Sequence, residues 1–224
     1  MELARYIIVV AGGRGTRMGS DTPKQFLPLA GSIVLMHTLE RMAAAEPQAQ
    51  LILALPHNQQ EEWKRLCEKY HYTRQHRIVD GGATRFETVS NALQYVPNNA
   101  IVAIHDGVRP LVSIGVIRQA FATAIEKGSA IPVVPVVDSL RHIDGETSHA
   151  VERSAYRAVQ TPQAFNSTLL KAAYDTPYRN EFTDDASVYE AAGHHINLID
   201  GNSENIKITI PQDIILAEYL LSHC

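Results

Sequence analysis

Residues 6–18 read YIIVVAGGRGTRM, an apolar run followed directly by a glycine-rich loop. The apolar run predicts a buried strand. The small residues after it let backbone N–H groups approach a ligand closely, because no side chain stands in the way. Arg17 and Lys24 place two positive charges on the same loop. The combination favours binding of a polyphosphate, although glycines that only turn a corner after a strand are the alternative.

Spacing excludes two familiar phosphate-binding loops. A dinucleotide fingerprint requires a third glycine where this chain has Met18, and Pro23 follows where a helix should already run. A Walker A loop requires Gly-Lys-Ser/Thr five residues after a first glycine, and no register of this segment supplies it. The loop therefore belongs to some other class of phosphate-binding site.

Apolar runs alternate with amphipathic segments along the chain, which predicts an α/β fold with a Rossmann-like, mostly parallel sheet and helices on both faces. The expected strands are Tyr6–Val10, Leu51–Leu55, Arg77–Val79, Ile101–Ile104, Ala130–Val134, Ile196–Ile199 and Ile206–Ile210. The expected helices are Ile33–Ala45, Gln59–Tyr70, Thr84–Tyr95, Ile114–Lys127, Leu169–Tyr174, Asp185–Ala192 and Gln212–Ser222, the last with Pro211 in its first turn. Without repeats or a low-complexity linker, residues 1–224 are expected to form a single domain.

One segment departs from this rhythm. From Asp138 to Val159 the sequence becomes polar and loosely alternating, with a turn candidate at Asp144-Gly145. The pattern predicts a protruding β-hairpin arm at about residues 138–160. A lone hairpin is marginally stable, so the arm is expected to pack against a second subunit in a homodimer. The alternative is a disordered loop, which the apolar residues Val151 and Tyr156 disfavour.

Composition limits the classes of function. The 224 residues carry a net charge of −4, which argues against a nucleic-acid partner because such proteins present a basic stripe. Cys67 and Cys224 are too few for a disulfide framework and lack metal-ligand spacing. No signal peptide or membrane-spanning run is visible, so a cytoplasmic protein without membrane contact is expected.

Three further motifs carry chemistry. HDGVRP, residues 105–110, follows a strongly apolar strand, so Asp106 should lie at the carboxyl edge of the sheet beside the glycine loop. A carboxylate next to phosphates suggests a Mg²⁺ ligand; a structural pair with Arg109 is the alternative. DGGATRFET, residues 80–88, exposes backbone groups that can read a base, or is only a helix cap. Lys207 interrupts an apolar run, as an anion ligand or as a protective lysine on an edge strand.

The candidate residues are rich in cations and contain no obvious general base. Arg153, Thr161 and Lys207 add to the positive and hydroxyl-bearing groups near the expected strand ends or arm. An attacking phosphate, with a second pKa of about 6, is already largely ionised at neutral pH. Transfer between phosphates therefore fits, because it requires positioning and charge stabilisation instead of proton abstraction.

In this order, the motifs Ala-Gly-Gly-x-Gly-Thr-Arg-Met, Pro-Lys-Gln, Asp-Gly-Gly, His-Asp-x-x-Arg-Pro, Thr-Pro-Gln and Asn-Ile-Lys-Ile-Thr resemble those of the 2-C-methyl-D-erythritol 4-phosphate cytidylyltransferases of isoprenoid biosynthesis. The resemblance runs from Val9 to the last expected helix. It implies a homodimeric, Mg²⁺-dependent transferase that converts CTP and the polyol phosphate into the CDP-alcohol and pyrophosphate. The opening loop alone is shared with many sugar-phosphate nucleotidylyltransferases, so the combination carries the specificity.

The resemblance also implies roles for individual residues. Arg17, Lys24 and Lys207 would act on the reacting phosphates, and Asp106 would bind both the metal and the acceptor. The remaining acceptor ligands would be Arg109, Ser139, Arg153 and Thr161, some of them supplied by the partner's arm. The CTP ligands would be Ala11, Gly12, Gly13, Gly15, Gly82 and Thr88.

Two residues depart from the family pattern. Ala83 replaces an acidic residue found in some relatives, which puts a second protein carboxylate at the metal in doubt, and Thr88 replaces a serine but keeps its hydroxyl. Two other functions remain open: a ribitol 5-phosphate or related polyol-phosphate cytidylyltransferase, and a non-catalytic CTP-binding protein. The presence of both Arg17 and Lys24 disfavours the second, since a mere binder has no need of charges aimed at the reacting phosphorus.

Overall fold

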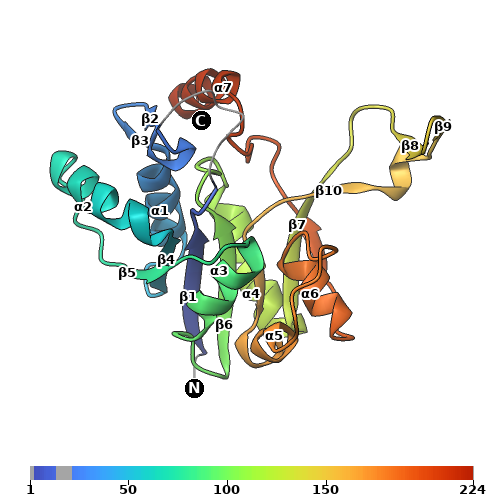
Figure 1. The fold of residues 1–224 in the computed structure, drawn as a ribbon, viewed down its shortest axis with the longest axis horizontal. Coiled ribbons are helices and arrows are strands. Elements are labelled where there is room, and N and C mark those ends of the chain that lie inside the picture. Colours follow the sequence, from blue (N-terminus) through green and yellow to red (C-terminus); the bar gives the residue numbers. More distant parts are fainter. Residues whose placement is uncertain (1–2, 14–21, 224) are drawn as a thin grey trace.

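The computed structural model describes residues 3–13 and 22–223 and shows a central sheet with helices on both faces (Figure 1). The main strands are β1 (Ala4–Val10), β4 (Gln50–Leu55), β5 (Arg77–Asp80), β6 (Ala100–Asp106), β7 (Ser129–Pro135), β10 (Arg157–Val159), β11 (Gln163–Asn166) and β12 (Leu198–Asp200). The helices are α1 (Val34–Ala45), α2 (Gln60–Lys69), α3 (Arg85–Leu93), α4 (Ile114–Lys127), α5 (Ser167–Tyr174), α6 (Asp185–Ala191) and α7 (Pro211–His223). This confirms the predicted fold class.

The sheet is mostly parallel, with an antiparallel insertion. Its order is β10-β7-β11-β6-β1-β4-β5, and β12 pairs with β7. Strand β11 runs antiparallel to both β6 and β7, and β10 runs antiparallel to β7. Strands β10 and β11 are not predicted by the sequence pattern, because they are only three and four residues long and their apolar runs are too short to stand out. Because β11 is antiparallel, the residues before it lie at the same edge as the carboxyl ends of the parallel strands.

Alternating side chains of β1 divide the core into two layers. Ile7 and Val9 pack with α1, α2 and α4, whereas Ile8 and Val10 pack with α3, α5 and α6. This two-sided burial explains why the strand reads as a continuous apolar run. Figure 1 looks onto the face that α3, α5 and α6 cover.

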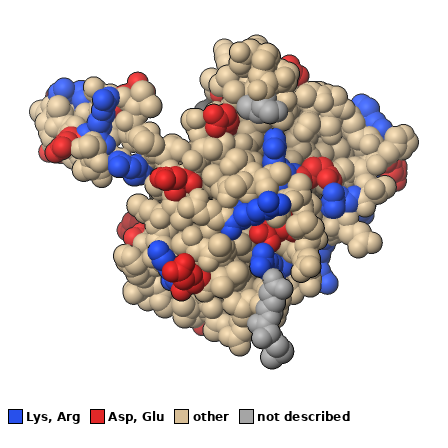
Figure 2. All heavy atoms as spheres, turned by 180° about the vertical axis from the view of Figure 1, so that it is seen from behind, with Lys and Arg blue, Asp and Glu red and all other residues tan. Residues whose placement is uncertain are grey.

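The hairpin arm is present where the sequence predicted it. Strands β8 (Arg141–Asp144) and β9 (Thr147–Ala150) pair antiparallel, and Gly145 in their turn has φ +57°, a left-handed conformation that glycine adopts without strain. The arm extends away from the body, and it carries both basic and acidic side chains (Figures 1 and 2). Ile143 is 67% exposed at its tip and Val137 is 81% exposed at its root.

The predicted strand at Ile206–Ile210 is wrong. This segment crosses above the carboxyl edge of the sheet, with a backbone hydrogen bond from Ile208 N–H to Val108 O. Its apolar residues, Ile206 and Ile208, pack with α7 and the turn after β6 instead of with the sheet. Two short strands, β2 (Pro28–Leu29) and β3 (Ser32–Ile33), pair with each other, and β2 contacts α7. Lys207 therefore lies on a crossing loop, which removes the edge-strand explanation for it.

Candidate active site

A cavity of about 200 Å³ lies at the carboxyl edge of the sheet. Segments from five parts of the chain line it: the loop after β1, the Lys24–Gln25 segment, the Gly82–Thr88 loop and helix start, the end of β6 with Val108, and Lys207. Backbone hydrogen bonds just beyond the strand ends hold these loops together. Gly107 N–H donates to Val10 O and Gly81 N–H donates to Leu55 O, both at 2.8 Å. The motifs singled out in the sequence thus converge here.

Hydrogen bonds from Gln25 hold the glycine-rich wall of the cavity in place. Ala11 is buried, and its carbonyl accepts a 2.7 Å hydrogen bond from Gln25 Nε2, which also donates to Gln59 Oε1. Gln25 thereby ties the loop after β1 to the start of α2. Gly12 and Gly13 are exposed to the cavity, while Gly15 and Arg17 lie outside the described residues.

The opposite wall begins at Gly82. A Cβ at this position would lie 2.2 Å from Glu87 Cβ, so no other residue fits. Gly82 N–H donates to Thr88 Oγ1 at 3.0 Å, and the Thr88 hydroxyl donates to Thr84 O at 2.8 Å. Thr84 also caps α3 by accepting from Glu87 N–H, so the capping role is confirmed, while the motif lines the cavity and base recognition by it stays a prediction.

Asp106 is a carboxylate surrounded by three positively charged side chains at this edge. Its Oδ2 lies 2.8 Å from Lys207 Nζ and 3.5 Å from Arg109 Nε, and its Oδ1 lies 3.7 Å from Arg85 Nε. Burial opposes ionisation of Asp106, but the attraction of Arg85 and then of Lys207 outweighs it and holds the pKa of the carboxyl well below its usual range. Asp106 is therefore a permanent anion with a surplus of cations around it.

Thr161 and His105 hold the backbone of Asp106 from behind. The Thr161 hydroxyl accepts a 3.1 Å bond from Asp106 N–H and lies 2.9 Å from His105 Nδ1, while His105 Nε2 lies 3.0 Å from Arg109 O. Burial lowers the pKa of His105 to about 4, so the ring is neutral. A neutral ring that donates from Nε2 to a carbonyl must accept at Nδ1, so Thr161 donates its hydroxyl proton to His105.

Asn205 connects this group to the crossing loop. Its side-chain Nδ2 donates to Thr161 O at 2.9 Å, and its backbone carbonyl accepts a hydrogen bond from Arg109 Nη1 at 2.7 Å. Asn205, His105, Gln25 and Arg85 are site residues that the sequence analysis did not single out. Each lies inside a motif it quoted, so motif membership was the available signal, but their burial was not visible.

Two predicted acceptor ligands lie elsewhere in this chain. Ser139 is exposed at the root of the arm, and Arg153, in the arm's short 3₁₀ segment (Arg153–Ala155), bonds through its guanidinium to Val137 O. Neither lines the cavity of its own chain, and Arg109 and Thr161, although close to Asp106, are not part of its lining either. Their assignment to the acceptor remains a prediction.

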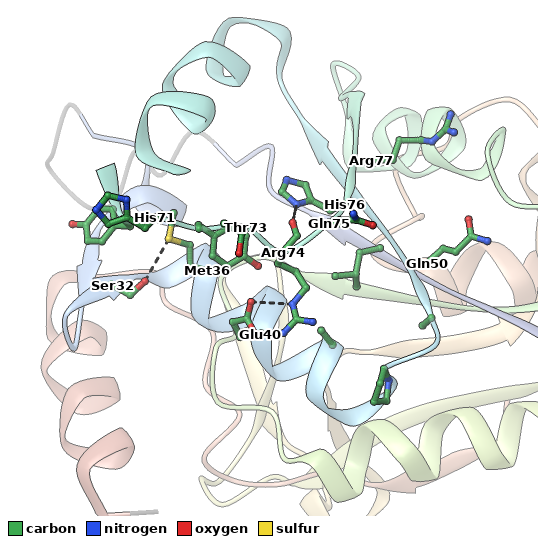
Figure 3. Close-up of a pocket in the computed structure, with 16 residues that line it drawn as sticks. Ser32, Met36, Glu40, Gln50, His71, Thr73, Arg74, Gln75, His76 and Arg77 are labelled. Carbon is green, nitrogen blue, oxygen red and sulfur yellow. Dashed lines mark hydrogen bonds and ion pairs between the residues drawn. The ribbon is translucent and has the colours of Figure 1, made fainter. Parts of the chain in front are cut away.

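A larger hollow of about 1160 Å³ lies along α1 and residues 70–77. Figure 3 shows Arg74 and Glu40 turned toward each other, with Arg74 donating to Glu40 at 2.7 and 3.1 Å, whereas Gln50 and Arg77 lie apart from this pair. Gln50 and Arg77, the first residues of β4 and β5, line this hollow, so it lies toward the amino ends of those strands. Ligands of open α/β sheets bind at the opposite edge, and the smaller cavity is therefore the candidate active site.

Comparison with known proteins identifies the family. The family model for 2-C-methyl-D-erythritol 4-phosphate cytidylyltransferase (IspD) matches residues 6–223. The chain belongs to this family. Cytidylyltransferases of that name from Porphyromonas gingivalis and Phocaeicola vulgatus are 51% and 50% identical, over 99% and 97% of this chain and 100% and 99% of theirs.

Solved structures of the family share the fold. The Anaerococcus prevotii 4-diphosphocytidyl-2C-methyl-D-erythritol synthase aligns with a TM-score of 0.82 and 26% identity over 98% of this chain and 99% of that one. The Thermus thermophilus 2-C-methyl-D-erythritol 4-phosphate cytidylyltransferase aligns with a TM-score of 0.74 and 31% identity over 99% and 100%. Among the helices described here, none combines the length and hydropathy that a bilayer crossing requires.

Proposed function

We propose that the protein transfers the cytidylyl group of CTP to 2-C-methyl-D-erythritol 4-phosphate, releasing pyrophosphate. One observation carries this proposal: in a chain about 50% identical to cytidylyltransferases of that name, Lys24, Lys207 and Asp106 line one cavity beside the glycine-rich loop. A phosphate oxygen of the acceptor attacks the α-phosphorus of CTP. The new P–O bond forms as the bond to the β-phosphate oxygen breaks, and pyrophosphate leaves with that electron pair.

The chain supplies charge and position for this step. Lys24 and Lys207 line the cavity, and we propose that they, together with Arg17, stabilise the negative charge that builds up on the α-phosphate and the leaving pyrophosphate. Lys207, whose side chain is 42% exposed, can turn from Asp106 toward an incoming phosphate. No residue need remove a proton, because the acceptor phosphate is already ionised at neutral pH.

The cytosine would bind between the two loops at the glycine-rich end of the cavity. Backbone groups of Ala11, Gly12 and Gly82 are proposed to contact the base, and the Thr88 hydroxyl holds the Gly82 amide in place. Gly13 and Gly15 would let the triphosphate approach the backbone. The tight packing at Gly82 supports this role. A Cβ at this position would clash with Glu87, so the residue stays a glycine and no side chain covers its backbone groups.

The family implies a divalent cation, and the donor set fits one that shares its ligands with the substrate. Among described residues lining the cavity, Asp106 is the only acidic one, and the described part of the chain has no cluster of three or more metal-ligating side chains. Mg²⁺ commonly binds through one carboxylate together with substrate phosphates. When bound, it would neutralise phosphate charge. Ala83 supplies no second carboxylate, and the Glu87 carboxylate, which accepts a hydrogen bond from Ala83 N–H, is not part of the cavity lining.

We also propose that the chain forms one domain and acts as a homodimer in which the arm of each subunit reaches the other's site. The exposed apolar residues Val137, Ile143 and Tyr156 support this, because an isolated hairpin does not benefit from leaving them in water. Ser139 and Arg153 would then reach the acceptor bound to the partner subunit, together with Arg109 and Thr161 in that subunit.

A side-by-side assay of pyrophosphate release tests the proposed reaction. CTP is paired with methylerythritol phosphate or ribitol 5-phosphate, and ATP, GTP and UTP serve as nucleotide controls. We expect kcat/KM for CTP with methylerythritol phosphate to exceed every other combination by at least about 100-fold. A preference for ribitol phosphate would support the related polyol-phosphate activity, and CTP binding without turnover would support a non-catalytic protein.

A further inference from the structure

Arg85 lies between two carboxylates at the edge of the cavity. It is the first residue of α3, directly after the Thr84 cap, and its side chain is 29% exposed. Its Nη1 and Nη2 donate to the two oxygens of Asp185 at 2.9 and 2.6 Å, and its Nε lies 3.7 Å from Asp106 Oδ1. We propose that the Arg85–Asp185 ion pair is a positioning device that fixes the Asp106 carboxylate, and through it Lys207, for binding and use of the acceptor phosphate; this rests on the proposed function.

The Asp185 side of the pair is rigid and out of reach of substrate. Asp185 is the first residue of α6 and is fully buried, so it contacts no ligand. Its Oδ1 accepts a further 2.7 Å hydrogen bond from the Tyr174 hydroxyl on α5. A bidentate guanidinium–carboxylate pair has a defined geometry. The orientation of Arg85 is therefore set from the protein interior.

The Asp106 side explains what this orientation achieves. Arg85 faces Oδ1, whereas Lys207 and Arg109 both face Oδ2. With one oxygen held by a fixed cation, the carboxylate keeps its second oxygen toward the crossing loop that carries Lys207. Without Arg85, the carboxylate can rotate out of this plane about its Cβ–Cγ bond, and the Lys207 ammonium loses its defined starting position.

Arg85 and Lys207 differ in their freedom to move. Arg85 cannot turn toward a phosphate without leaving the buried Asp185 carboxylate unpaired, which is strongly unfavourable. Lys207 lies on a loop, its ammonium contacts a carboxylate that two arginines also approach, and it is more exposed than Arg85. Arg85 therefore acts through Asp106 as a positioning residue, and Lys207 is the cation available to the acceptor.

The variant Asp185→Asn tests this assignment, because it alters the pair from a position no substrate can touch. We expect the KM for methylerythritol phosphate to rise at least about fivefold and kcat to fall at least about tenfold, with the KM for CTP within about twofold of wild type. Arg85→Lys should act in the same direction, since one ammonium cannot span both carboxylates. Tyr174→Phe, which keeps the ion pair but removes one bond to Asp185, should show a smaller effect of the same kind.

Phe86→Leu is the matched control for simple loss of stability. Phe86 is the next residue on α3, is buried, and stacks on Tyr174 with ring centroids 4.7 Å apart. It should lower the melting temperature and leave both KM values unchanged. If Asp185→Asn does not fold, Arg85→Lys and Tyr174→Phe decide the question. Unchanged acceptor KM in the folded variants would overturn the proposal, whereas a wild-type protein inactive with CTP and methylerythritol phosphate would overturn the proposed function.

Discussion

Lys207 Nζ lies 2.8 Å from Asp106 Oδ2, although the two residues are 101 positions apart in the chain. The contact joins the end of the central strand β6 to a loop that crosses above it. It also determines the resting state of the site, in which the exposed lysine is paired with a carboxylate that no change in pH near neutrality can protonate. A phosphate entering the cavity competes with Asp106 for this ammonium.

Lys24→Ala should lower kcat at least about 100-fold while leaving the KM for CTP within a few fold, because its charge acts mainly on the transition state. Steady-state pyrophosphate release measures both constants. Lys64→Ala is the control, since Lys64 is an exposed lysine on α2 that pairs with Glu61. An unchanged kcat with a large rise in KM would assign Lys24 to ground-state binding instead.

Asp106→Asn should weaken the dependence of activity on Mg²⁺ and raise the KM for the acceptor. The change removes the charge that holds Lys207 and Arg109 and also removes the proposed metal ligand. Initial rates over a Mg²⁺ titration provide the measurement. Asp175→Asn, at the end of α5 and outside the cavity lining, should leave the titration unaltered. An unaltered titration in Asp106→Asn would remove this residue from the metal site.

The free energy of unfolding should decrease as the pH is lowered from about 6.5 to about 4. The upper value is the ordinary pKa of histidine, and the lower is the pKa to which burial lowers His105. In this window the unfolded chain binds a proton that the native state does not, so the free energy of unfolding decreases as pH decreases, by up to about 1.4 kcal/mol per pH unit. Denaturant unfolding at pH 7, 6 and 5 measures the slope.

His105→Asn should reduce this slope without abolishing it. Burial also lowers the pKa of His76, which accepts a hydrogen bond from Trp63 Nε1 and so contributes in the same direction. Asp106 acts separately, because a carboxyl with a lowered pKa loses its contribution only below about pH 4. An identical slope in His105→Asn and wild type would show that His105 does not titrate in this range.

Mixing Arg153→Ala and Lys24→Ala subunits should restore activity if the arm completes the partner's site. In each mixed dimer one site carries both substitutions and the other carries neither, so random exchange should return about a quarter of wild-type activity. Pyrophosphate release before and after subunit exchange provides the readout. Absence of recovery, with mixed dimers verified by mass, would place Arg153 and Lys24 in sites built within one subunit.

The sequence predicted the parts of this molecule that depend on local patterning. Strand β1, the capped helix α3 and the hairpin turn at Gly145 follow from apolar runs, Thr84 and a glycine in a left-handed conformation. The segment around Lys207 was misassigned because Ile206 and Ile208 are apolar and alternate, as strand residues do. Their actual partners lie on α7 and beyond β6, and such distant packing leaves no local signal.

The site was predicted as a set of motifs and not as a network. Asp106, Lys207 and Gly82 were recognised because each interrupts or ends an apolar run. Arg85 was passed over because its partner, Asp185, is a hundred residues away on a different helix. An arginine near a helix start looks like a solvated residue until the fold shows a buried carboxylate in front of it.

The arm joins the body through β10, which ends at Val159, two residues before Thr161. The Thr161 hydroxyl accepts a hydrogen bond from Asp106 N–H. The arm is therefore connected to the backbone of Asp106 through only two residues after β10. If binding of the arm to a second subunit shifts this segment and so alters substrate affinity, then bound substrate must alter the affinity between the subunits by the same factor. Assembly and substrate binding would then be coupled, without a dedicated effector site.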